Sequence, residues 1–134
     1  MTGRLGSNAK LASRVGTDEG GTRIVKELAA FPLDYNFIQR DPLLPTGAVT
    51  VAIAKQRQPA YCVYENVAWD SFEFSPAWSQ LALDADAVCF GTLAQQSPLF
   101  KPTTGKFLAT ARKGCLQILD LNLRYPFVIE ETIK

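Results

Sequence analysis

The residue types best suited to chemistry lie in the segment Asp120-Leu-Asn-Leu-Arg124. Leu116 to Leu121 is an apolar run that predicts a buried strand, and side chains two positions apart on a strand share one face. Asp120, Asn122 and Arg124 would then converge at the carboxyl end of this strand, where open α/β sheets bind ligands. Arginine offers a bidentate fork for phosphate or carboxylate. The pattern predicts a ligand site, although Asp120 could instead pair with Arg124 while Asn122 caps a turn.

The elements that must position this strand end alternate between strands and helices. Lys10 to Val15 favours a strand, Asp18 suits a helix N-cap, and the apolar spacing that follows predicts a helix from about Glu19 to Ala30. Ala87 to Phe90 and Leu116 to Leu121 are continuous apolar runs, typical of strands buried on both faces of an α/β sheet. With 134 residues, 47% of them hydrophobic, the chain is expected to form one α/β domain.

Two more helices are predicted in the second half of the chain. Ser75-Pro76 supplies an N-cap and a first-turn proline for a helix that ends near Asp84. A later helix is predicted only over Thr103 to Ala111, because Pro102 and Gly105 are expected to interrupt it.

The middle of the chain has the period of a β-hairpin. Val49, Val51 and Ile53 alternate with smaller residues, and a polar turn follows at 55–58. Pro59 to Tyr64 would form the second strand of the hairpin. Branched residues on one face and small residues on the other predict a two-stranded sheet with one covered face. Such a hairpin would act as a flap or lid.

Composition excludes several classes of protein. Fourteen basic and thirteen acidic residues leave a charge of +1, so neither nucleic acid nor an anionic membrane is an expected partner. No apolar stretch is long enough to span a bilayer or serve as a signal peptide, which favours the cytoplasm. Cys62, Cys89 and Cys115 are widely spaced in apolar segments and are expected to be buried thiols. The lack of histidine excludes histidine-based catalysis and most zinc sites.

Five segments follow one another along the chain in an order found in a known family. They are Arg14-Val-Gly-Thr-Asp-Glu-Gly-Gly21, Pro45-Thr-Gly-Ala-Val-Thr50, Glu65-Asn-Val-Ala-Trp-Asp70, Cys89-Phe-Gly-Thr-Leu-Ala-Gln95 and the D-x-N-x-R segment that ends at Arg124. Together they resemble the PfkB (ribokinase-like) carbohydrate kinases, in the fructokinase-like branch. The resemblance covers essentially the whole chain.

This resemblance implies a three-layer α/β/α ribokinase-like fold with a β-hairpin lid, here incomplete. Residues 1–134 would form a single partial domain, with the lid at about 35–68. The complete family uses ATP and Mg²⁺ to phosphorylate a sugar hydroxyl. Sugar is therefore the expected substrate, with fructose favoured.

The resemblance also assigns candidate binding residues. The residues expected to face phosphate or sugar are Asp120, Asn122 and Arg124. Those expected on the sugar side are Gly91, Thr92 and Gln95, and Asn66 is a further expected contact. Gly91 could instead be a turn glycine, and Gln95 a solvated loop residue. Among the aromatic residues near the lid, core packing is favoured for Phe74 and Trp78, while Trp69 could stack on a sugar.

Other parts of the family pattern are missing from this sequence. The family's opening strand, with its sugar-binding aspartate, and its Gly-Gly-x-x-Asn segment would precede Met1, and no G-x-G-D segment supplies the catalytic base and anion hole. Phosphoryl transfer depends on positioning and charge stabilisation. We therefore expect no catalytic residues, little or no kinase activity, and weak binding of ATP and Mg²⁺ by this chain alone.

Two further segments look like ligand motifs, and the hairpin allows an alternative function. Pro102-Thr-Thr-Gly-Lys106 departs from the P-loop pattern, and Asp18-Glu-Gly-Gly21 is explained by a helix cap, so no metal site is predicted. The alternative function is a non-catalytic sugar-binding or oligomerisation module built on the lid, through residues such as Val49, Val51 and Tyr61. Unpaired strand edges also favour homo-oligomers.

Overall fold

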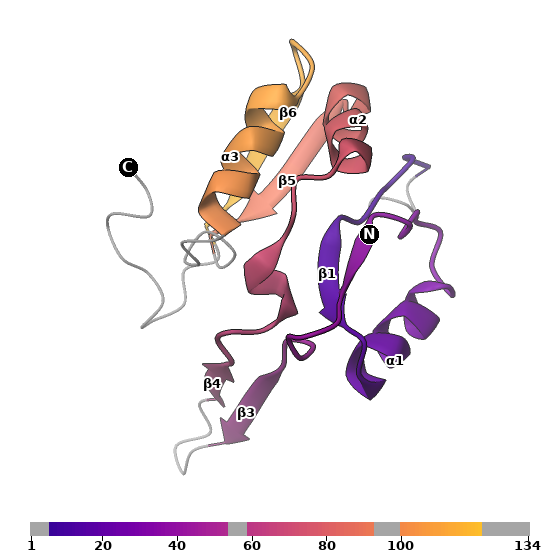
Figure 1. Cartoon of the computed structure of the whole chain (residues 1–134). Helices are drawn as coiled ribbons and strands as arrows, with labels where there is room; N and C mark the ends of the chain where they lie inside the picture. Colours follow the sequence, from indigo (N-terminus) through magenta and orange to yellow (C-terminus); the bar gives the residue numbers. More distant parts are fainter. Residues whose placement is uncertain (1–5, 54–58, 93–99, 122–134) are drawn as a thin grey trace. The chain divides into compact units, whose positions relative to one another are not determined.

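A computed structural model describes residues 6–53, 59–92 and 100–121 of the chain (Figure 1). The chain divides into two compact units, Met1–Asp70 and Ser71–Lys134. Unit 1 contains two small sheets and one α-helix, and unit 2 contains one small sheet and two α-helices within the described residues. Each unit contains both helices and strands, and each has a parallel strand pair joined through a helix, so the expected α/β class is confirmed.

Unit 1 begins with a strand, a helix and a parallel strand. β1 (Ser13–Gly16) leads into α1 (Glu19–Leu28), and β2 (Ile38–Asp41) then pairs with β1 in parallel. Asp18 caps α1 because its side chain accepts a hydrogen bond from the Gly21 amide. The predicted strand and helix are therefore confirmed, whereas β2 was not predicted because its four residues lack a clear period.

The predicted hairpin is also present in unit 1. β3 (Val49–Ile53) and β4 (Pro59–Val63) are antiparallel, with Val49 opposite Val63 and Val51 opposite Tyr61. The expectation of one covered face is wrong, since the described residues on both faces are mostly exposed. A two-stranded hairpin keeps both of its faces exposed unless another element packs over one of them. The 3-10 helix η2 (Ala68–Ser71) follows the hairpin.

Unit 2 contains α2 (Pro76–Asp84), β5 (Ala87–Gly91), α3 (Phe100–Thr110) and β6 (Leu116–Asp120). β5 and β6 pair in parallel from Ala87 opposite Leu116 to Gly91 opposite Asp120, and Figure 1 shows them side by side. Ser75 caps α2 by accepting from the Trp78 amide, and Pro76 occupies the first turn. The predicted α2, β5 and β6 are therefore confirmed.

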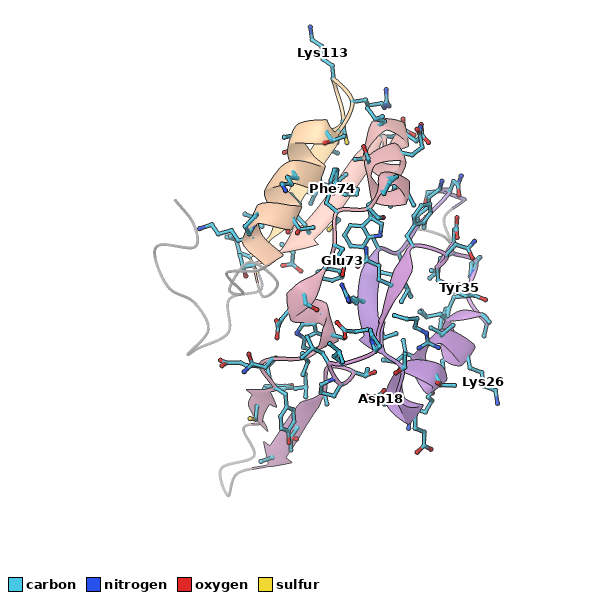
Figure 2. The ribbon with its side chains drawn as sticks, in the orientation of Figure 1. Asp18, Lys26, Tyr35, Glu73, Phe74 and Lys113 are labelled. Carbon is cyan, nitrogen blue, oxygen red and sulfur yellow. The ribbon has the colours of Figure 1, made fainter. Side chains whose placement is uncertain are left out.

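An aromatic cluster forms the core of unit 2. Trp78 is buried, with its ring centroid 5.3 Å from that of Phe72 and 6.1 Å from that of Phe107. Phe74, labelled in Figure 2, packs edge-on against Phe107 at 6.5 Å. The core interpretation is therefore confirmed for Trp78, whereas Phe74 is half-buried and packs at the edge of the cluster.

Helix α3 corrects one prediction. It runs unbroken through Pro102 and Gly105. Pro102 is the third residue of the helix, where an amide has no intrahelical acceptor, so the missing N–H costs no hydrogen bond. Proline here starts the helix instead of interrupting it.

Burial of the strands in unit 2 was overestimated. Every residue of β6 is exposed, and Cys89 on β5 is exposed too. Ile118 and Leu119 point to opposite faces of β6 and are 44 and 42% exposed, so the described part of unit 2 leaves apolar surface open on both faces. The prediction of buried thiols is likewise wrong for Cys62 and Cys89, while Cys115 is half-buried.

Candidate functional site

The candidate site lies at the carboxyl edge of the β5–β6 pair, which we call the β5–β6 edge and define by Gly91, Thr92 and Asp120. The parallel register sets Gly91 directly opposite Asp120. The Thr92 amide donates to the Asp120 carbonyl at 3.2 Å, and the Thr92 hydroxyl donates to the Leu121 carbonyl at 2.6 Å. Three residues singled out from two distant segments of the sequence are thus neighbours.

The chemistry available at this edge comes from Asp120 and from the space beside Gly91. Asp120 is an exposed residue of β6. Among the described residues, a Cβ at Gly91 would meet only the Asp120 carbonyl oxygen, at an ordinary 3.7 Å, so packing against these residues does not require glycine there. Thr92 is buried and its hydroxyl is used by the backbone, which makes it a support for the edge. Gln95, Asn122 and Arg124 lie outside the described residues.

Asn66 belongs to unit 1 and follows the hairpin. Its φ of 58° is in the left-handed region, which asparagine tolerates better than most residues. The side chain is exposed, and next to it the Val67 amide donates to the Asp70 carboxylate at 3.1 Å. A tight turn is thus sufficient to explain why asparagine stands at this position.

Unit 1 contains a polar cluster that sequence analysis did not recognise as one feature. We call it the Asp18 clamp, formed by Asp18, Thr46, Gly16 and Gly21. Asp18 accepts from the Gly21 amide at 2.8 Å, from the Thr46 hydroxyl at 2.5 Å and from the Thr46 amide at 2.7 Å. The Thr46 hydroxyl accepts from the Gly16 amide at 3.0 Å. Two of the five resemblance segments therefore interlock at the base of the hairpin.

The hydrogen bonds of the clamp favour the ionised form of Asp18, and its close packing requires glycine at position 21. The hydrogen bonds from the Thr46 hydroxyl, the Thr46 amide and the Gly21 amide lower the pKa of Asp18 from 3.8 to about 2, and Arg40 contributes in the same direction. A Cβ at Gly21 would lie 2.2 Å from the Gly16 carbonyl oxygen. Only glycine therefore fits at position 21 without a backbone shift.

A buried ion pair lies next to the clamp in sequence. Arg14 Nε is 2.9 Å from the Asp41 carboxylate, and both side chains are at least nine-tenths buried. Asp41 also accepts from the amides of Leu43 and Leu44 at 2.8 and 2.9 Å. It therefore joins the end of β2 to the chain that leads into the hairpin.

Other classes of site receive no support from the described residues. Among them, no group of three or more His, Cys, Asp or Glu side chains could hold a metal ion. Within the same ranges, no helix has the length and apolar character needed to cross a membrane. Pro102–Lys106 lies within α3, which agrees with its rejection as a phosphate-binding loop.

Comparison with known proteins supports the resemblance read from the sequence. No family model matches the chain. The curated sugar kinase PH1459 of Pyrococcus horikoshii is 28% identical over 141 residues, which cover 98% of this chain and 45% of that protein. The crystal structure of PH1459, described there as an uncharacterized sugar kinase, matches with a TM-score of 0.84 and 26% identity. The chain is thus similar to one part of a PfkB-type sugar kinase.

Further solved structures agree on the ribokinase-like fold. A fructokinase of Halothermothrix orenii gives a TM-score of 0.81 at 22% identity, over 96% of this chain and 45% of its own. PH1459 has also been solved in complex with ATP, and that structure gives a TM-score of 0.82 over 93% of this chain. The chain spans less than half the length of these relatives, so it has part of the ribokinase-like fold.

Proposed function

We propose that this chain is the sugar-binding part of a PfkB-type carbohydrate kinase and does not transfer phosphate by itself. The observation that carries the proposal is the register of β5 and β6, which brings Gly91 and Thr92 beside Asp120. Ligands of open α/β sheets bind at such strand ends. Sugar kinase relatives that match nearly the whole chain make a sugar the substrate class of choice.

The proposed roles extend the β5–β6 edge to residues known only from the sequence. Asn122 and Arg124 would continue from Asp120 toward the phosphate or sugar, because the D-x-N-x-R spacing suits one face. Gln95 would act with Gly91 and Thr92 on the sugar side, and Asn66 would contribute from the end of the hairpin. The hairpin, within the proposed lid at 35–68, would close over the sugar.

Catalysis is the part of the family function that we propose is absent. The 134 residues contain no G-x-G-D segment to provide a base and an anion hole. We also propose that the chain alone binds ATP and Mg²⁺ weakly; among the described residues, no group of three or more His, Cys, Asp or Glu side chains could hold a metal ion. Without charge stabilisation for the transferred group, sugar binding and turnover become separable properties.

Isothermal titration of the chain with fructose and related sugars, alongside a coupled phosphorylation assay with ATP and Mg²⁺, tests the proposal. Heat of sugar binding without turnover is the expected result. Turnover would overturn the proposed loss of catalysis. If the titration gives no heat and the assay shows no turnover, sugar binding by this chain is overturned.

Two arginine variants sharpen this test. Arg124→Gln removes the proposed guanidinium contact and is expected to weaken sugar binding about tenfold, because hydrogen bonds from a charged donor are stronger than those from a neutral one. Arg112→Gln is the matched control, since Arg112 pairs with Asp86 just before the start of β5, at the other end of the strand pair. Equal effects of the two changes would count against a site at the β5–β6 edge.

One observation favours a second function, self-association through the hairpin. Val49, Val51 and Tyr61 share one face of the hairpin and are 44, 51 and 44% exposed. Such a face suits a second copy of the same hairpin. Sedimentation should then show an oligomer that Val51→Lys dissociates, while Leu43→Lys, at a residue 90% exposed in the same unit, leaves it intact.

A further inference from the structure

The base of the hairpin in unit 1 is fixed on both of its chain segments. On the entry side, Thr46 is held by Asp18 and Gly16 just before β3 begins. On the exit side, the Tyr64 amide donates to the Ala48 carbonyl at 3.2 Å, and the Ala68 amide donates to the Pro45 carbonyl at 2.8 Å. The two segments are thereby tied to each other, and the clamp ties the entry segment to helix α1.

Trp69 adds an apolar contact at the same place. A Cβ at Gly47 would lie 2.5 Å from the Trp69 ring, so the indole packs directly on the glycine backbone. This contact explains both residues without a ligand. It also provides a spectroscopic probe within the hairpin base, because indole signals respond to their packing.

Asp18 makes three hydrogen bonds that only a carboxylate can accept together. Its Oδ1 serves the Gly21 amide and the Thr46 hydroxyl, and its Oδ2 serves the Thr46 amide. A serine could still cap α1 with its single oxygen, as Ser75 does for α2. It could not reach two donors of Thr46 as well. Capping the helix and holding the hairpin are therefore separable functions of one side chain.

We infer that Asp18 is the positioning residue of the hairpin, which it holds in one orientation on α1 by binding both donors of Thr46. The clamp acts on the backbone of Thr46 and on Gly16, so it fixes the direction in which the chain enters β3. The idea that this orientation helps the hairpin to cover a sugar rests on the proposed function. The positioning of the hairpin by the clamp does not depend on the proposed function.

The decisive experiment measures hydrogen exchange of the Tyr64 and Ala68 amides in the full chain. Neither amide touches Asp18, so a role limited to capping α1 would leave both unchanged. In Asp18→Ser we expect these amides to exchange about tenfold faster, while the amides of α1 keep their protection. Ser75→Ala, which removes an N-cap from unit 2, serves as the control and should leave them unaltered.

A second pair of variants decides the question if Asp18→Ser does not fold. Thr46→Val keeps the carboxylate and the helix cap but removes the hydroxyl, and it should speed exchange at the same two amides. Thr46→Ser restores the hydroxyl and should restore protection. Fluorine NMR of labelled tryptophan should show the Trp69 signal moving in the valine variant and returning in the serine variant.

The inference is overturned if exchange at Tyr64 and Ala68 is unchanged in both Asp18→Ser and Thr46→Val, or if only the amides of α1 lose protection. Sugar titration is kept as a separate measurement. Should the unmodified chain bind no sugar, the proposed function fails while the exchange data still decide the clamp. Should sugar bind, Asp18→Ser should weaken it without abolishing it.

Discussion

The two units hold their chain segments together by different means. In unit 1, side-chain polar groups bridge residues far apart in sequence, such as Asp18 with Thr46 and Arg14 with Asp41. Unit 2 also has such links, from Thr92 to Leu121 and from Arg112 to Asp86, but its core is an aromatic cluster around Trp78, and backbone hydrogen bonds join β5 to β6. Apolar packing is tolerant of detail, whereas each polar bridge needs a particular partner. Substitutions in the two units should therefore fail for different reasons.

The largest expected effect comes from the core of unit 2. Trp78→Ala removes a buried ring that contacts Phe72 and Phe107, and large-to-small core changes of this kind cost about 3–5 kcal/mol. Leu83→Ala is the control, since Leu83 is exposed on the same helix. Hydrogen exchange of the α2 amides measures the loss of stability in both variants. Similar losses for the two variants would mean that the aromatic cluster is not the core of this unit.

The next largest effect is expected at the buried ion pair of unit 1. Asp41→Asn leaves the Arg14 charge at a largely buried position without its carboxylate, which should cost about 3 kcal/mol. Asp86→Asn removes the partner of Arg112 in an exposed pair of unit 2 and should cost about 0–1 kcal/mol. Denaturant unfolding, monitored by hydrogen exchange in each unit, compares the stability costs of the two variants. Equal costs would remove the contrast between the units.

Alanine substitutions at two glycines are expected to change stability by smaller amounts, and the two changes have opposite signs. Gly21→Ala forces a Cβ against the Gly16 carbonyl and should destabilise unit 1 by about 2 kcal/mol. Gly105 lies within α3, where a Cβ would meet open space, so Gly105→Ala should stabilise that helix by about 0.5–1 kcal/mol. Thermal unfolding of both variants checks the signs. Stabilisation by Gly21→Ala would show that the clamp tolerates a shift.

The same contrast explains which features were predictable from sequence. Local signals gave the caps at Asp18 and Ser75, the hairpin and the strand ends at Gly91 and Asp120, because period and capping act over a few residues. The Asp18–Thr46 pairing was missed because it joins positions 28 apart, and a pattern along one chain does not specify such a partner. Burial of β6 was misjudged because exposure depends on what covers a strand, which an apolar run does not encode.

The smallest predicted effect concerns the charge of Asp18. Its pKa in the folded chain is about 2, below the ordinary 3.8, so the unfolded chain binds this proton more readily. The contribution of the ionised carboxylate to stability is therefore fully present above about pH 4 and is lost as pH falls from there toward 2. NMR titration of the carboxyl carbon should show a midpoint near 2, with Asp18→Asn identifying the signal.

The cause of this low pKa can be tested with the same titration. The Thr46 hydroxyl makes the largest contribution, followed by the Thr46 and Gly21 amides, while Arg40 is the charged group that acts on the carboxylate. Thr46→Val should raise the midpoint toward 3.8, because it removes the strongest hydrogen bond to the ionised form. Arg40→Gln should raise it less. A larger change with Arg40→Gln would mean that charge attraction, and not the clamp hydrogen bonds, keeps Asp18 ionised.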